Sequence, residues 1–175
     1  MVFACNPGSN AGSEANKSNH RAAIDCGDPV IYMEHKELWG LQGEVSPRDI
    51  PLGKANVVRE GKDLTLVTWS RTVHAALQAE TKKSVEIIDL RTLWPWDRET
   101  VLSSVRKTGE LLVVHEAVQA AGFGAEIAAT VAEETGARVR RLGAPRIPVG
   151  YAISLEDEAR VSAEKIAACI ARLFQ

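Results

Sequence analysis

The sequence holds few cysteines, and they are not arranged to crosslink a fold. Cys5, Cys26 and Cys169 are the three present, an odd number of widely spaced residues without a CxxC pair. This pattern argues against both a disulfide framework and a zinc site, so we expect no metal centre. A chain of 175 residues buries about two thirds of the surface that it exposes when unfolded, and so needs no crosslink.

Long apolar runs and an excess of charge of one sign are also missing. The apolar runs are far too short to span a bilayer, and the N-terminus lacks the basic and apolar regions of a secretory signal. The formal net charge of -2 gives no electrostatic reason to expect nucleic acid or an anionic membrane as a partner. We therefore expect a cytoplasmic protein that binds neither.

Aliphatic residues are scarce in residues 1–20, which are rich in Asn, Ser, Gly and Ala. Such a segment cannot bury enough apolar surface to offset its ordering entropy, about 1–2 kcal/mol per residue. We expect much of it to be loosely ordered unless a partner covers it.

Strand patterns and helical patterns alternate along the rest of the chain. Short apolar runs typical of strands occupy residues 29–33, 64–69, 85–90 and 111–114, with a weaker strand at 139–142. Helical patterns occupy residues 71–80, 97–107, 124–135 and 162–174. The alternation predicts right-handed βαβ crossovers and an α/β fold of three αβα layers. Its sheet would be small and mostly parallel, and one edge strand could be antiparallel.

Polar residues and glycines mark the ends of the predicted helices. Ser70 is placed to cap the first helix, a role worth about 1 kcal/mol, and Asp97 is placed to cap the second. Gly109 and Gly136 would end the second and third helices, because glycine readily adopts the left-handed conformation that closes a helix.

Polar residues also follow the predicted parallel strands, where ligands bind in open α/β sheets. These residues are Ser70, Asp89, Arg91 and the pair His115 and Glu116. A serine, an aspartate and a histidine would suit a hydrolase triad, but the chain around Ser70 lacks the glycines of a nucleophile elbow. Asp89 has Arg91 nearby as an ion-pair partner, so the sequence assigns no catalytic residue.

Two pairs of hypotheses stay open at this edge. Gly122 and Gly124 open a helix whose N–H groups could bind a phosphate or carboxylate, or else they allow close packing of the helix on a strand. His115 and Glu116 form either a proton-handling pair in a cleft or a structural contact at a domain or subunit boundary. The candidate ligand or anion residues are Ser70, Arg91, His115, Glu116, Gly122 and Gly124.

Blocks of sequence in a fixed order resemble a known family. The blocks are Asp28–Trp39, Ile50–Ala55, Val57–Gly61, Leu66–Arg71, Ile88–Leu93, Val105–Gly109, Val113–Ala117 and Gly122–Ala128. Together they are similar to the C-terminal portion of the β subunit of thiamine-diphosphate-dependent 2-oxo acid dehydrogenases. This E1 component serves pyruvate, branched-chain 2-oxo acids or acetoin. The similarity runs from about Arg21 to the end of the sequence.

The resemblance implies three parts. Residues 1–27 are a polar leader that matches the family poorly. Residues 28–53 resemble the last strand of the family's pyrimidine-binding domain, followed by a turn-rich linker. Residues 54–175 resemble its transketolase-like C-terminal domain, which in that family supplies subunit contacts.

The resemblance also implies what the chain does not do. In that family the pyrimidine-binding domain carries the glutamate that activates the cofactor, and this sequence has no counterpart of it. We therefore expect no catalytic residue and no cofactor bound by this chain alone, thiamine diphosphate belonging to the intact enzyme. The expected function is that of a truncated or free-standing C-terminal domain in subunit assembly and protein interaction. One alternative is a component of a split thiamine-diphosphate E1 enzyme, and another is a small anion-binding module.

An interaction domain of this kind should expose apolar surface near residues 29–39, because such patches on soluble proteins usually mark an interface. We expect a homodimer or higher oligomer. The E1 α subunit and the E2 core are the further partners that the resemblance implies. The candidate interface residues are Val30, Tyr32, Trp39, Trp94 and Trp96.

Overall fold

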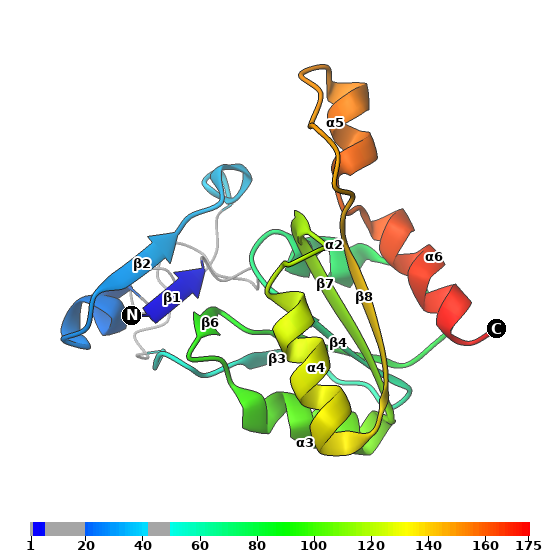
Figure 1. The fold of residues 1–175 in the computed structure, drawn as a ribbon, viewed down its shortest axis with the longest axis horizontal. Helices are drawn as coiled ribbons and strands as arrows, with labels where there is room; N and C mark the ends of the chain where they lie inside the picture. Colours follow the sequence, from blue (N-terminus) through cyan, green and yellow to red (C-terminus); the bar gives the residue numbers. More distant parts are fainter. Residues whose placement is uncertain (1, 6–19, 42–49) are drawn as a thin grey trace.

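The computed structural model describes residues 2–5, 20–41 and 50–175, and its centre is a five-stranded sheet (Figure 1). In sheet order the strands are β3 (Asn56–Arg59), β5 (Val85–Asp89), β4 (Leu64–Thr68), β7 (Glu110–Val118) and β8 (Arg138–Ala144). The last four run parallel, and β3 pairs antiparallel with β5 at one edge. The predicted α/β fold with a mostly parallel sheet is confirmed.

Helices cover both faces of the central sheet (Figure 1). They are α2 (Thr72–Gln78), α3 (Arg98–Thr108), α4 (Gly124–Thr135) and α6 (Ala163–Leu173). One hydrophobic cluster joins the sheet to α3 and α4, and a second joins it to α2 and α6. Leu66 and Val67 are adjacent in β4, fully buried, and belong to opposite clusters. Because successive strand residues point to opposite faces, this arrangement gives three layers.

Two short helices were not predicted. The 3-10 helix η1 (Lys36–Leu38) lies in the linker after β2, and α5 (Ile153–Ala159) lies between β8 and α6. Of the side chains in α5, only Ala159 is buried. Within the ranges that the structure describes, no helix is long and apolar enough to cross a membrane.

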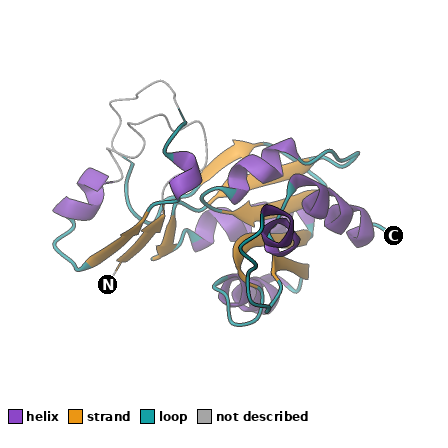
Figure 2. Ribbon diagram, turned by 90° about the horizontal axis from the view of Figure 1, so that it is seen from above, coloured by secondary structure: helices purple, strands orange, loops and turns teal. Residues whose placement is uncertain are grey.

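A small second sheet lies beside the main body (Figure 2). In order it contains β2 (Val30–Met33), β1 (Val2–Cys5) and β6 (Thr92–Trp94). The expectation of a loosely ordered leader is therefore wrong for residues 2–5, because β1 pairs parallel with β2 and antiparallel with β6. Pairing on both sides satisfies backbone groups whatever the side chains are. Residues 20–25 are helical, and residues 6–19 lie outside the described ranges.

The cap predicted for Ser70 is wrong. Arg71 precedes α2 as its N-cap and makes no side-chain cap hydrogen bond, while Ser70 adopts a left-handed backbone with φ 57°. The hydroxyl of Thr72 instead donates to the Trp69 carbonyl at 2.7 Å and accepts from the Thr68 hydroxyl at 2.7 Å. The N-cap position therefore falls one residue later than predicted, at Arg71.

The other predicted helix ends are confirmed. Gly109 and Gly136 end α3 and α4 with φ of 74° and 65°. The carboxylate of Asp97 accepts the N–H of Thr100 at 3.2 Å, and it also accepts the N–H of Ala55, before β3, at 3.0 Å. Burial would raise the pKa of Asp97, but these hydrogen bonds outweigh it and hold the pKa below its usual value.

We expect Asp97→Ala to lower the free energy of unfolding at neutral pH by about 1–3 kcal/mol, because two N–H groups lose their acceptor. Since the folded pKa is lowered, the contribution is full above the unfolded pKa of about 3.9 and is lost as pH falls through the folded pKa. Urea unfolding of both proteins across the acid range measures this. Asp157→Ala, an exposed carboxylate, is the control. Equal losses in the two variants would contradict the assignment.

Candidate functional site

The carboxyl ends of β4, β5 and β7 meet at one edge of the central sheet, which we call the carboxyl edge. Thr68 of β4 is in register with Asp89 of β5, and the N–H of Leu90 donates to the Thr68 carbonyl at 3.0 Å. Ser70 and Arg91 follow this paired stretch directly. The parallel order of the strands thus brings the predicted polar residues to a common edge.

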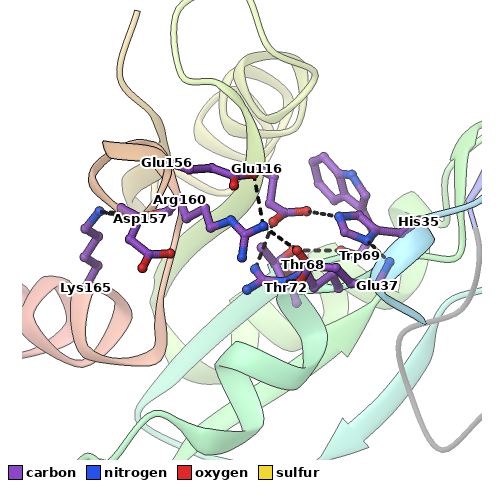
Figure 3. Close-up of polar contacts among 11 residues, drawn as sticks. His35, Glu37, Thr68, Trp69, Thr72, Glu116, Glu156, Asp157, Arg160 and Lys165 are labelled. Carbon is purple, nitrogen blue, oxygen red and sulfur yellow. Dashed lines mark hydrogen bonds and ion pairs between the residues drawn. The ribbon is translucent and has the colours of Figure 1, made fainter. Parts of the chain in front are cut away.

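A chain of ion pairs crosses the carboxyl edge (Figure 3). Nη1 of Arg71, at the start of α2, lies 2.9 Å from Oε1 of Glu116 in β7. Oε2 of the same glutamate lies 2.9 Å from Nε2 of His35, in the linker after β2. On its other side Arg71 pairs with Glu37 of η1. Through His35 and Glu37, the linker that follows β2 is therefore held to β7 and to the start of α2.

The network continues to α5 through Arg160, which pairs with Glu37 and with Glu156, the latter at 3.0 Å. The ammonium group of Lys165, in α6, adds a second fastening. It donates to carbonyl oxygens at the C-terminal end of α5, those of Asp157, Glu158 and Arg160, at 2.9, 2.7 and 2.7 Å. A cation is favourable there because the C-terminal end of a helix is the negative end of its dipole.

The protonation states follow from these contacts. Nδ1 of His35 accepts the N–H of Glu37 at 3.2 Å, so the proton of the neutral ring lies on Nε2, facing Glu116. Burial would raise the pKa of Glu37, but the hydrogen bond and charge of Arg71 and the charge of Arg160 outweigh it and lower the pKa. Glu37 is therefore ionised at neutral pH, where it pairs with both arginines.

His115 does not join Glu116. Its fully buried ring stacks on Trp69, with 5.3 Å between centroids, and its Nδ1 donates to the Ala117 carbonyl at 3.0 Å. Burial lowers the pKa of His115 despite that hydrogen bond, so the imidazole is neutral near pH 7. Because neighbouring strand residues point to opposite sides, the proton-handling pair is not formed. Glu116 instead makes a structural contact, the alternative to a proton-handling pair, through its ion pairs with His35 and Arg71.

The glycines at the start of α4 have a packing role. A Cβ at Gly124 would lie 2.5 Å from Nε2 of His115, and a Cβ at Gly122 would lie 2.7 Å from its Cε1. Atoms do not approach so closely, so the buried ring requires glycine at both positions. Close packing of the helix on the strand is therefore one role of both glycines.

Backbone strain gathers at the carboxyl edge. Ser70, Arg91 and Ala121, which follow β4, β5 and β7, have φ of 57°, 59° and 61°. A left-handed non-glycine residue costs of the order of 1–3 kcal/mol, and such residues cluster at functional sites. Among the described residues, the buried Nε of Arg91 has no hydrogen-bond partner. The expected contact of Arg91 with Asp89 is made by its backbone N–H, at 3.2 Å.

The candidate interface residues separate into two groups. Trp96 is buried in the core beside α3, so it cannot contact a partner. Val30 and Tyr32 are half-buried, because the outward face of β2 carries Ile31 and Met33 instead. The exposed apolar side chains of β2, of β6 and of the residue that follows η1, here together called the small-sheet surface, are Ile31 (45% exposed), Met33 (41%), Trp94 (52%) and Trp39 (65%).

Sequence reasoning missed the centre of the ion-pair network. Glu34 to Glu37 have no metal-ligand spacing, and Arg71 carries no motif. The partners of Glu37 are 34 and 123 residues away in sequence, so no local pattern could have paired them. Within the described part of the chain, no three His, Cys, Asp or Glu side chains gather in a way that could hold a metal ion.

Comparison with known proteins identifies the fold that carries this network. The family described as "Transketolase, C-terminal domain" matches residues 53–166. This chain belongs to that family. The split gene transketolase, solved as an inactive β4 tetramer, superimposes with a TM-score of 0.73 over 98% of this chain and 57% of its own, at 22% identity. At that identity the likeness shows a shared fold.

Curated relatives confirm the resemblance to E1 β subunits. The β subunit of acetoin:2,6-dichlorophenolindophenol oxidoreductase from Cupriavidus necator is 45% identical over 157 residues, which are 83% of this chain and 46% of the relative. The 2-oxoisovalerate dehydrogenase β subunit of Bacillus subtilis is 37% identical over 168 residues, 89% of this chain and 51% of the relative. The chain thus spans about half the length of these relatives.

We expect Arg71→Ala to release the linker, because Glu37 and Glu116 both lose their shared cation. The pairs are partly exposed, so the free energy of unfolding should fall by only about 0.5–1 kcal/mol. Hydrogen exchange of the Leu38 and Trp39 amides, which bond within η1, should accelerate severalfold. Arg98→Ala, which removes a single surface pair with Glu134, is the control. Unchanged exchange in Arg71→Ala would show that the linker is held by other contacts.

Proposed function

We propose that this chain acts as the C-terminal assembly domain of an E1 β-type subunit of a 2-oxo acid dehydrogenase. Support comes from its family and from relatives named as β subunits of acetoin:2,6-dichlorophenolindophenol oxidoreductase, 2-oxoisovalerate dehydrogenase and pyruvate dehydrogenase, of which it spans about half. An E1 α subunit and an E2 core are the partners proposed beside a second copy of the chain. The cytoplasm is the proposed location.

The small-sheet surface carries this proposal. Register places Ile31 and Trp94 on either side of the same residue of β1, so they lie in one row across the small sheet. Large apolar and aromatic side chains exposed together mark protein interfaces, where tryptophan is enriched. The His35 and Glu37 contacts to the central domain hold the neighbouring linker in place. The segment that joins this surface to the central domain is therefore held at its C-terminal side.

We further propose that catalysis needs another chain or domain. Activation of thiamine diphosphate requires a carboxylate placed at its aminopyrimidine ring. The buried carboxylates in the described residues have other partners. Asp97 accepts from Ala55 and Thr100, Asp89 from the Arg91 N–H, and Glu86 from Lys107. By themselves, the buried carboxylates of the described residues therefore do not fit the cofactor.

We expect the purified chain to sediment as a dimer or larger. The double variant Ile31→Asp/Met33→Asp should raise the dissociation constant about tenfold or more, because association would bury two carboxylates. Sedimentation equilibrium measures this, with Ala129→Asp, an exposed position on α4, as control. A wild-type chain that stays monomeric at high concentration would contradict self-assembly.

Activity assays separate the assembly domain from a split enzyme. With thiamine diphosphate and a 2-oxo acid, the chain alone should show no decarboxylation. Turnover by the chain alone would refute the proposal. Turnover that arises only when an E1 α subunit and a separate N-terminal half of a β subunit are added would favour the split-enzyme alternative.

A second candidate function, an anion-binding module, is favoured by one observation. Arg91 is largely buried in a left-handed conformation at the carboxyl edge, and its Nε has no partner among the described residues. Burial lowers the pKa of Arg91, although the negative charge of Asp89 raises it. Because burial makes the charged guanidinium costly, an added anion would be favourable beside it. We centre this candidate on Arg91 and Ser70, with Gly122 and Gly124 at the start of α4 as its further candidate residues.

If the carboxyl edge binds anions, inorganic phosphate or a carboxylate should raise the melting temperature of the wild type. The same additions should shift Arg91→Gln much less, because the guanidinium group supplies the binding charge. Thermal unfolding with a concentration series measures both shifts, and Arg98→Gln, an exposed arginine on α3, is the control. A flat response of the wild type would dismiss this function.

A further inference from the structure

The exposed apolar side chains of the projection between β8 and α6 take no part in the contacts described so far. The projection comprises residues 146–158, here called the hook, and it stands out from the body of the molecule at the α5 end (Figure 1). Its exposed apolar side chains are Ile147 (50% exposed), Val149 (65%), Tyr151 (104%), Ile153 (77%) and Leu155 (58%). Five such residues in nine positions exceed the scattered exposure that is normal for a soluble surface.

Polar contacts fasten the hook to the rest of the chain, although its apolar side chains bury little surface there. Lys165 binds three carbonyl oxygens at the end of α5, and Arg160 joins Glu156 to Glu37. A Cβ at Gly150 would lie 2.5 Å from Cβ of Leu155, so the loop packs directly on the first turn of the helix. A surface fixed before binding loses less entropy when a partner covers it.

A groove of about 600 Å³ lies at the other end of α6, between that helix and the loop after α2. Its apolar wall consists of Ala167, Ile170, Ala171 and Phe174. Lys82 and Lys83 stand at its rim beside Glu80, and Nζ of Lys83 lies 4.2 Å above the centre of the Phe174 ring. The groove therefore offers apolar contact bordered by two cations and one carboxylate.

The hook and the groove are complementary in both polarity and charge. The apolar residues of the hook are followed directly by Glu156, Asp157 and Glu158, the last two of which are exposed. The apolar wall of the groove is bordered by Lys82 and Lys83. Opposite charges around an apolar contact steer association and fix its register.

The hook cannot reach the groove of its own chain. α5 projects beyond the N-terminal end of α6, whereas the groove lies at its C-terminal end (Figure 1). We infer that the hook of one copy of this chain docks into the groove of a second copy, with Ile153 and Leu155 on the apolar wall and the acidic residues toward Lys82 and Lys83. This inference rests on the proposed assembly function, and it adds a contact separate from the small-sheet surface.

Complementation between two variants tests the contact. Tyr151→Ser/Ile153→Ser removes exposed apolar contact from the hook, and Ala171→Glu places a carboxylate in the groove, where it repels the acidic end of the hook. Each variant alone should weaken the hook-mediated association about tenfold or more in sedimentation equilibrium. A mixture of the two should regain association, because one variant keeps an intact groove and the other an intact hook. Ala168→Glu, an exposed position on the same helix outside the groove, is the matched control and should associate as the wild type does.

Charge reversal provides an independent measurement. Lys82→Glu should weaken association, and Glu158→Lys in the same chain should restore it, because the opposed charges are then exchanged. Circular dichroism checks that each variant is folded, which is expected because the substituted side chains are exposed.

The outcomes separate this contact from the proposed function. Normal association of the hook variant, or a mixture that associates no better than its two components, would overturn the hook-to-groove contact. If association then depends on Ile31 and Met33 alone, the assembly function stands without it. If the hook variants alone lose association, the contact stands and the small-sheet surface does not mediate self-assembly.

Discussion

Burial of β4 on both faces is the constraint on which the other features depend. Leu64, Leu66 and Val67 are fully buried, and the strand pairs in parallel with β5 on one side and β7 on the other. Parallel pairing requires a helical crossover between strands, so helices must cover both faces. It also brings the carboxyl ends of the strands to one edge, where Arg71 and Glu116 can meet although 45 residues separate them.

Charged side chains fasten the parts that apolar packing does not hold. In η1 and α5 the buried side chains are Leu38 and Ala159, too few to fix either element by hydrophobic contact. The ion pairs are partly exposed, and each such pair contributes at most about 1 kcal/mol. Arg71, Glu37 and Arg160 each take part in more than one of these pairs. Together the pairs connect the linker, helix α2 and the hook. The apolar residues of the linker and the hook can therefore face outward, toward partners.

Buried polar atoms and strain at the carboxyl edge have separate causes. The ring of His115 is accommodated by glycines at 122 and 124, so its immediate surroundings are a packing arrangement. Ser70, Arg91 and Ala121 keep left-handed backbones without glycine, and the Arg91 Nε is left without a partner among the described residues. Packing explains why glycine is needed beside the His115 ring, but it explains neither the unpartnered Nε2 of His115 nor the unpartnered Nε of Arg91 among the described residues. For this reason anion binding at the carboxyl edge remains the second candidate function. The proposed assembly function depends instead on the exposed apolar surfaces.

Local sequence patterns predicted the α/β class, the four parallel strands of the central sheet with helices α2, α3, α4 and α6, the Asp97 cap and the glycine helix ends. Each of these depends on periodicity or on backbone groups within a few residues, which local patterns report. The tertiary structure alone decided that Ser70 is no cap, that Trp96 is a core residue, that Ile31 and Met33 face outward, and that Glu37 meets Arg71 and Arg160. These depend on strand register and on chain segments brought together from 34 to 123 residues apart, which no local pattern encodes.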